Sequence, residues 1–388
     1  MIQFGWPRLQ GRDPHEDGRT ATPLELFFDL VFVVAVALAS ESLHHFESEG
    51  HFSTGIIRYL MVFFAIWWAW MNFTWFASAY DTDDWLYRVL TLVQMAGALV
   101  IAAGVPDAMN DFDFRLMIAG YIVMRIALVA QWLRAAHGHP ERRATTLWYA
   151  GGVVAVQLLW TAVWLVPGEV RASVFALGVV CELAVPVLAE RHGTTTWHPH
   201  HIAERYGLFT IIVLGESILA SATSIIEAVE ESGHDGQLVA ISLSAFVIVA
   251  GMWWVYFAYP QHHRLNGLRA ALTWGYGHYA IFAAAAAFSA GIEVALDHET
   301  HHTGIAAAKA AATTCVPVAI FLAAVWWLLI RTSADRVVNF TIPAIAALAL
   351  LAVFAPYSLQ LLALLMIAGV VVIVVRTPGP AAAPAGQH

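Results

Sequence analysis

The chain has 388 residues, of which 60% are hydrophobic and 12% are charged. A soluble domain carries roughly 25% charged residues, so this composition excludes an ordinary soluble fold and indicates an all-α integral membrane protein. The net charge of −9 also argues against a nucleic-acid partner, because phosphate backbones bind basic surfaces.

Segments of about 20 mostly apolar residues, long enough to cross a bilayer as helices, follow one another along the chain. A polar stretch, residues 1–21, precedes them, and because it has no apolar core before a cleavage site we expect no signal peptide. Twelve spans are predicted, at 24–40, 56–79, 86–105, 114–134, 145–166, 171–189, 203–226, 237–258, 274–296, 308–330, 337–355 and 357–376. The last two are joined through Pro356 without a charge, and residues 377–388 are expected to be a disordered tail.

The first span carries two acids, in the stretch TPLELFFDLVFVVAVALAS of residues 22–40. Thr22, Pro23 and Glu25 fit a capping box at a helix start, which gives Glu25 a structural interpretation. Asp29 lies one turn further along the same helix face. Because charge at bilayer depth is costly, we expect Asp29 to pair with a basic residue on another span, to make a buried structural hydrogen bond, or to exchange a proton or bind a cation.

The seventh span begins in a second dense stretch, HHIAERYGLFTIIVLGESIL, residues 200–219. Arg205 and Glu216 are eleven residues apart, about three helical turns, so they lie on nearly the same face of the helix at different depths in the membrane. We therefore expect them to face one cavity. Glu216 should lie near mid-membrane, where it either carries a proton or pairs with a cation such as Arg125 of the fourth span. Arg125 itself is interpreted as the partner of a buried acid.

Histidines are the remaining candidates for chemistry. His278 of the ninth span is interpreted as a buried imidazole satisfied by a hydroxyl group, with metal ligation as the alternative. Among the clustered loop histidines, His200 and His201 are weak metal candidates, because no spacing matches a closed zinc site. Cys181 and Cys315 fall in apolar runs and predict no disulfide framework.

The basic residues alternate between the predicted sides of the membrane. With the N-terminus inside, fourteen arginines fall on the cytoplasmic side: Arg8, Arg12, Arg19, Arg88, Arg134, Arg142, Arg143, Arg191, Arg205, Arg264, Arg269, Arg331, Arg336 and Arg376. The other side holds four basic residues: Arg58, Arg115, Arg171 and Lys309. This positive-inside bias predicts that both termini are cytoplasmic.

Two halves of the chain share a weak internal similarity. ELFFDLVFVVAVAL begins at Glu25 and ERYGLFTIIVLGES at Glu204, and tryptophan pairs follow at Trp67 and Trp253. The near-constant offsets, 179 (25 to 204) and 186 (67 to 253), predict six-helix halves at 22–200 and 201–376 in a parallel repeat. The alternative is that membrane helices are built from the same few apolar residue types, so that any two of them align by chance.

The stretches at 22–40 and 200–219 resemble the two signatures of the bacterial low temperature requirement protein A family, and WWAWMNFTWFASAYDTDD at 67–84 is similar to that family as well. The resemblance extends from about residue 20 to 375 and implies a polytopic inner-membrane protein. The family name reflects growth in the cold and not a reaction, and the histidine-rich loops are not part of the family pattern. The characteristic residues it implies are Glu25, Asp29, His201, Glu204, Arg205 and Glu216.

The favoured function is a proton- or cation-coupled secondary transporter of a small solute. Its site would lie between the halves, with Asp29 and Glu216 as buried acids and Arg205 at the inner entrance. The full set of candidate site residues is Glu25, Asp29, Arg125, Glu204, Arg205, Glu216 and His278. The alternatives are an intramembrane metal- or haem-binding enzyme, or a membrane protein without turnover that supports growth in the cold. No cofactor is strongly implied, the expected partners are the lipid bilayer and a small solute or ion, and homo-oligomerisation is left open.

Overall fold

The structure is a computed structural model that describes residues 8–163, 166, 168–232 and 236–377, with side chains placed outside 168–169 and 223–232. Within these ranges the chain is helical and contains no strand, which confirms the expected all-α class. The long helices are α1 (Pro23–Ser48), α2 (Phe52–Tyr80), α3 (Trp85–Ala103), α5 (Arg115–Gly138), α6 (Arg143–Ala162), α7 (Gly168–Ala189), α8 (Pro199–Ser232), α9 (Gly236–Phe257), α10 (Leu268–Glu299), α11 (Ala307–Val325), α12 (Arg336–Ala352) and α13 (Ser358–Arg376). A short helix, α4 (Val105–Asn110), was not expected.

Side-chain caps fix where several of these helices begin. The predicted capping box starts α1, because the Thr22 amide donates to Glu25 Oε2 over 2.7 Å and the Glu25 amide donates to Thr22 Oγ1 over 3.3 Å. Asp84 accepts the amides of Leu86 and Tyr87 at the start of α3, each over 2.9 Å. Residues within one turn of each start therefore define these helix ends.

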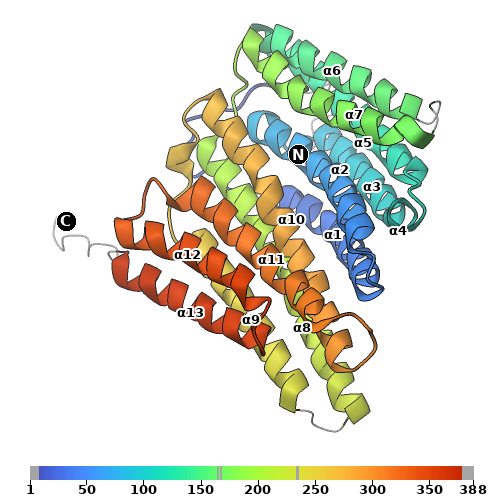
Figure 1. The fold of residues 1–388 in the computed structure, drawn as a ribbon. Coiled ribbons are helices and arrows are strands. Elements are labelled where there is room, and N and C mark those ends of the chain that lie inside the picture. Colours follow the sequence, from blue (N-terminus) through green and yellow to red (C-terminus); the bar gives the residue numbers. More distant parts are fainter. Residues whose placement is uncertain (1–7, 164–165, 167, 233–235, 378–388) are drawn as a thin grey trace, which may run out of the picture. The chain divides into compact units, whose positions relative to one another are not determined.

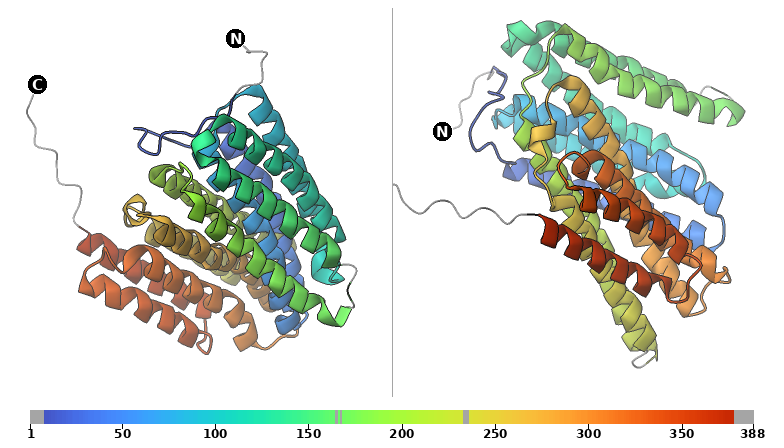
Figure 2. Two further views of the ribbon diagram at one scale, coloured as in Figure 1. Left: turned by 90° about the horizontal axis from the view of Figure 1, so that it is seen from above. Right: turned by 60° about the vertical axis from the view of Figure 1, so that its left-hand side comes forward.

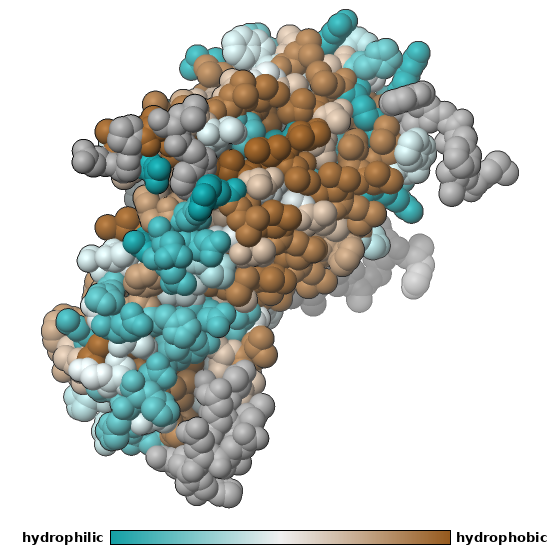
Figure 3. All heavy atoms as spheres, turned by 90° about the vertical axis from the view of Figure 1, so that its right-hand side faces the viewer, coloured by the Kyte–Doolittle hydropathy of each residue, from teal (hydrophilic) through white to brown (hydrophobic). Residues whose placement is uncertain are grey.

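The described helices suit a bilayer. Nine of them are long and apolar enough to cross a membrane, and Figure 3 shows broad apolar areas on the surface of one face. Exposed side chains such as Leu158, Ile126 and Val375 lie 65%, 66% and 75% open, as lipid contact requires. The protein is therefore a membrane protein. The twelve crossings remain a prediction, although α12 and α13 are separate helices with a turn at Tyr357 between them.

The helices form two compact units. Unit 1 comprises Met1–Ala39, Arg58–Phe209 and His262–Ala271. Within it α3 packs on α5, α5 on α6 and α6 on α7, in the cyan to green part of Figure 1. Gly97 of α3 and Gly120 of α5 permit the closest of these approaches, since a Cβ at Gly97 would lie 2.8 Å from the Gly120 carbonyl oxygen.

Unit 2 comprises Ser40–Ile57, Thr210–Gln261 and Leu272–His388. Within it α9 packs on α13, and α11, α12 and α13 lie side by side, as the orange and red ribbons of Figures 1 and 2 show. The expected halves at 22–200 and 201–376, and the 6+6 repeat, remain predictions.

Candidate functional site

Arg205 is the centre of a buried ion cluster in unit 1. From α8 its Nη1 lies 3.0 Å from Glu25 Oε1, and its Nη2 and Nε lie 2.5 and 3.2 Å from the Asp29 carboxylate. The side chains of Arg205, Glu25 and Asp29 are all 0% exposed. The planar guanidinium thus bridges two acids that stand one turn apart on α1, which a lysine ammonium cannot do with the same geometry.

The carboxylates of Asp29 and Glu25 also accept hydrogen bonds from uncharged side chains. The Trp70 indole donates to Asp29 Oδ1 over 2.7 Å, and His201 Nε2 lies 3.2 Å from Glu25 Oε2. An ionised carboxylate only accepts hydrogen bonds, so the arrangement places the His201 proton on Nε2. Asp29 and Glu25 are therefore held as charged acceptors in a dry site.

Two further charged residues extend this cluster. Arg19 Nη2 lies 3.9 Å from Glu25 Oε1 and 3.8 Å from Asp81 Oδ2, and both Arg19 and Asp81 are almost fully buried. Asp81 Oδ1 accepts the Asp83 amide over 2.9 Å, whereas Oδ2 accepts no hydrogen bond from any described residue. We call Arg19, Glu25, Asp29, Asp81, His201 and Arg205 the arginine network.

Charge does not balance in the arginine network. Among its described members three carboxylates face two guanidinium groups, so with a neutral His201 the network carries one negative charge in excess. Burial raises the pKa of Asp81 to about 6, with the charge of Glu25 adding to the effect and Arg19 opposing it. One proton on Asp81 would neutralise the network.

Glu204 and His200 lie outside the arginine network. Half-buried Glu204 accepts the Ala21 amide over 3.0 Å and so anchors the segment that leads into α1. His200 is exposed, with its ring 5.0 Å from that of His262. Throughout the described part of the chain no three histidine, cysteine or acidic side chains gather closely enough to hold a metal ion.

Arg125 forms a second buried ion pair in unit 1, with Glu182 of α7. Its Nη2 lies 2.6 Å from Glu182 Oε1, and the indoles of Trp68 and Trp160 each donate to this carboxylate over 2.8 Å. The acid that Arg125 pairs with is therefore Glu182, and the pairing with Glu216 considered from the sequence is wrong.

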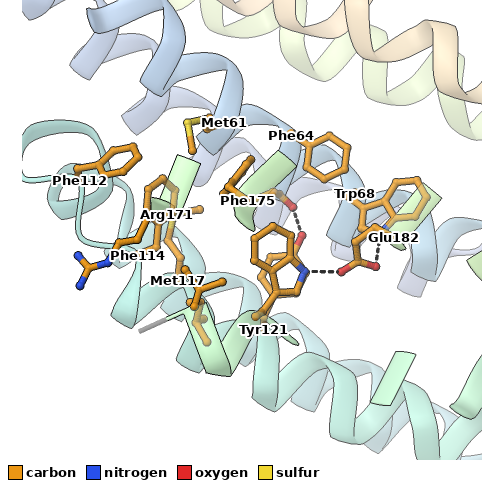
Figure 4. Close-up of a pocket in the computed structure, with 14 residues that line it drawn as sticks. Met61, Phe64, Trp68, Phe112, Phe114, Met117, Tyr121, Arg171, Phe175 and Glu182 are labelled. Atoms are coloured by element: carbon orange, nitrogen blue, oxygen red, sulfur yellow. Dashed lines mark hydrogen bonds between the residues drawn. The ribbon is translucent and has the colours of Figure 1, made fainter. Parts of the chain in front are cut away.

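The Glu182 carboxylate closes one end of an aromatic pocket, shown in Figure 4. Phe112 and Arg171 lie toward the other end, and the walls are apolar: Met61, Phe64, Phe114, Met117 and Phe175. The cavity holds about 50 Å³, room for only a few water-sized groups. Its single carboxylate already accepts three donors, which favours a role in packing over solute recognition.

Glu216 belongs to unit 2, where it interacts electrostatically with other acids. Glu41 of α1 and Glu293 of α10 are the acids that interact with it, and among the side chains that the structure describes it forms no salt bridge. His278 is fully buried, donates from Nδ1 to the Trp274 carbonyl over 2.7 Å and lies 3.0 Å from the Tyr256 hydroxyl. This is the hydroxyl-satisfied histidine that the sequence suggested.

The structure thus brings together Glu25, Asp29, His201 and Arg205, and it adds Arg19 and Asp81, which sequence reasoning missed. Asp81 lies in the segment 67–84 that carried a family resemblance, and this was the available signal. Asp29 and Glu216 fall in different units, so their expected shared cavity remains a prediction.

Comparison with known proteins shows to which family this chain is similar. An uncharacterized protein of Rhizobium meliloti (strain 1021), named "Uncharacterized protein RA0937", is 30% identical over 256 residues, which make up 63% of this chain and 60% of that protein. The chain thus spans less than two thirds of that relative's length. The family model of the bacterial low temperature requirement A protein (LtrA) matches residues 20–376, nearly the whole chain. The protein therefore belongs to the bacterial low temperature requirement A family.

Proposed function

We propose that this protein is a proton-coupled transporter of a small solute in the bacterial inner membrane, with both termini cytoplasmic and with the arginine network as its proton-binding site. The observation that carries the proposal is the excess of one carboxylate over guanidinium in a cluster shielded from solvent. An uncompensated charge in such a place is costly, and binding a proton removes it.

Asp81 is the group that takes the proton. Arg205 lies 3.0 Å from Glu25 and 2.5 Å from Asp29, so protonating either acid would weaken a close ion pair, whereas the nearest described cation to the Asp81 carboxylate is Arg19 at 3.8 Å. Asp81 Oδ2 has no hydrogen bond to lose among the described residues. Arg12, whose side chain is 27% exposed, donates to the Asp81 carbonyl oxygen, so the network approaches solvent on this side.

Arg19 links Asp81 electrostatically to Glu25, which contacts Arg205 where α1 meets α8. Arg19 stands almost equally far from Asp81 and Glu25, at 3.8 and 3.9 Å. When Asp81 is neutral, Arg19 is attracted to Glu25 alone and competes there with Arg205. Protonation therefore changes how strongly Arg205 holds α1 to α8, and a solute that prefers one of the two arrangements is coupled to the proton.

The test is proton-driven uptake in proteoliposomes that contain the purified full chain. A panel of labelled solutes is offered with and without an imposed pH gradient, while an enclosed pH-sensitive dye follows proton entry. We expect at least one solute to accumulate with the gradient, and Asp81→Asn to abolish the gradient dependence while the protein still folds. Asp83→Asn is the matched control, because the Asp83 side chain is 53% exposed and pairs with Arg88.

The outcomes decide among the candidate functions. Gradient-driven uptake that Asp81→Asn leaves intact would remove the network from the mechanism. No gradient effect for any solute, with equal proton entry in wild type and variant, would contradict the transporter itself and favour a membrane protein without turnover. A metal- or haem-binding enzyme is favoured only if the purified protein carries a stoichiometric metal or a visible absorption band.

A further inference from the structure

His44 of α1 stands between two acids of α10 in unit 2. Its Nδ1 lies 3.1 Å from Glu293 Oε2, and its Nε2 lies 2.6 Å from Asp297 Oδ2. Ser48, one turn after His44, donates to the same Asp297 oxygen over 2.8 Å. We call His44, Glu293 and Asp297 the histidine triad.

The count of protons in the histidine triad follows from the chemistry of imidazole. A neutral imidazole carries one N–H and one lone pair, whereas ionised carboxylates only accept hydrogen bonds. If His44 were neutral and both acids ionised, one ring nitrogen would bring its lone pair within 3.1 Å of a carboxylate oxygen, which is electrostatically unfavourable. The Nε2–Asp297 contact has the geometry of a hydrogen bond, and the Nδ1–Glu293 contact is an ion-pair distance. These short distances favour one further proton, either on the ring or on one of the two carboxyl groups.

The surroundings favour keeping that proton. Glu41 of α1 and Glu216 of α8 both interact electrostatically with Glu293, and both add negative charge. His302, in the loop after α10, interacts with Asp297, and the ring of exposed His45 lies 5.1 Å from that of His44. The side chains of His44, Glu293 and Asp297 are 15%, 34% and 27% exposed, so none of the three is fully enclosed by the protein.

We propose that the histidine triad is a second proton-binding site, which holds one proton between His44, Glu293 and Asp297 near neutral pH. It shares no residue with the arginine network, so it stands whether or not the protein is a transporter. Sequence spacing supports it as well: Glu41, His44 and Ser48 recur at helical intervals on α1, and Glu293 and Asp297 are four apart on α10.

Histidine nitrogen NMR of the full chain in lipid nanodiscs tests the proposal. Uniform ¹⁵N-histidine labelling gives ring signals, and the pair that disappears in His44→Gln belongs to His44. Near neutral pH we expect both ring nitrogens of His44 to have the ¹⁵N chemical shifts of protonated imidazole nitrogens. His45→Gln is the matched control, since it removes a different pair and should leave the His44 signals unchanged.

Infrared spectra of the same samples locate the proton if the ring is neutral. A protonated-carboxyl band that is lost in Glu293→Gln or Asp297→Asn also supports the proposal, because the proton is then on that acid. A neutral His44 ring together with no such band would overturn it. Asp297→Asn keeps the ring in place, and we expect it to lower the fraction of doubly protonated His44; an unchanged fraction counts against the triad.

Discussion

The arginine network of unit 1 and the histidine triad of unit 2 hold acids in contrasting ways. Glu25 and Asp29 meet a guanidinium that stays charged at all accessible pH values, and their side chains are 0% exposed. Glu293 and Asp297 meet an imidazole, whose charge changes near neutral pH, and they are about one third exposed. The first arrangement is suited to permanent structure with one exchangeable acid at its edge, Asp81, whereas the second is suited to exchange throughout.

The largest effect should come from removing the cation of the arginine network. Arg205→Met leaves Glu25 and Asp29 buried without their partner, and we expect a loss of about 3–5 kcal/mol in unfolding free energy. In the triad, His44→Gln should cost about 1 kcal/mol or less, because its partners are partly exposed and not locked in the protein interior. Thermal unfolding in detergent, followed by intrinsic fluorescence, measures both.

An exposed arginine provides the control for this comparison. Arg88 pairs with Asp83, and their side chains are 58% and 53% exposed, so Arg88→Met should leave the unfolding free energy almost unchanged. Equal losses for Arg205→Met and Arg88→Met would show that burial does not separate the two kinds of site, and the contrast between network and triad would fail.

A smaller loss of stability is expected from removing the Trp70 indole, which donates a hydrogen bond to Asp29. Trp70→Phe removes one hydrogen bond to a buried carboxylate and should cost about 1.5–3 kcal/mol. Trp75→Phe, on the same helix, removes a bond to the neutral Tyr206 hydroxyl and should cost about 0.5–1.5 kcal/mol. If Trp75→Phe proved the more damaging in the same unfolding assay, Asp29 would not be the charged acceptor described above.

The finest effect concerns pH. The pKa of Asp81 is raised from 3.8 to about 6 by burial, so the native state binds this proton more tightly than the unfolded state does. Stability from Asp81 is therefore fully present below pH 3.8 and is lost as the pH rises through about 6. The melting temperature of the wild type should therefore fall as the pH rises from 3.8 to about 6, and we expect this fall to be smaller in Asp81→Asn.

The slope of the melting temperature against pH distinguishes Asp81 from its neighbour. Asp83→Asn changes an exposed side chain and should retain the wild-type slope. A slope that is identical in Asp81→Asn and in the wild type would assign the titration to another group and would remove Asp81 as the proton carrier of the arginine network.

Local patterns predicted the local structure well. Thr22 and Glu25 indicated the start of α1 because a capping box needs only four consecutive residues. Apolar length likewise predicted a helix near each expected span. The one-turn spacing of Glu25 and Asp29 correctly placed both acids on a common face, since both contact Arg205.

Charge pairing was decided by the tertiary structure alone. Arg205 and Asp29 are 176 residues apart, and Arg125 and Glu182 are 57 apart, so nothing in the local pattern says which acid meets which cation. Asp81 was only one letter of the stretch 67–84 in the sequence, and its burial beside Arg19 is seen only in the tertiary structure.

The sequence by itself determined that the protein lies in lipid and that its spans are helices, because apolar runs of bilayer length can form all their backbone hydrogen bonds in lipid only as helices. It also determined that acids within these runs need partners. Only the tertiary structure decided the partners, because ion pairing depends on distances of a few ångströms between helices far apart in the chain. That is why Glu25 and Asp29 could be recognised as special from the sequence, while the charge left over at Asp81 and the contact of Glu293 and Asp297 with His44 could not.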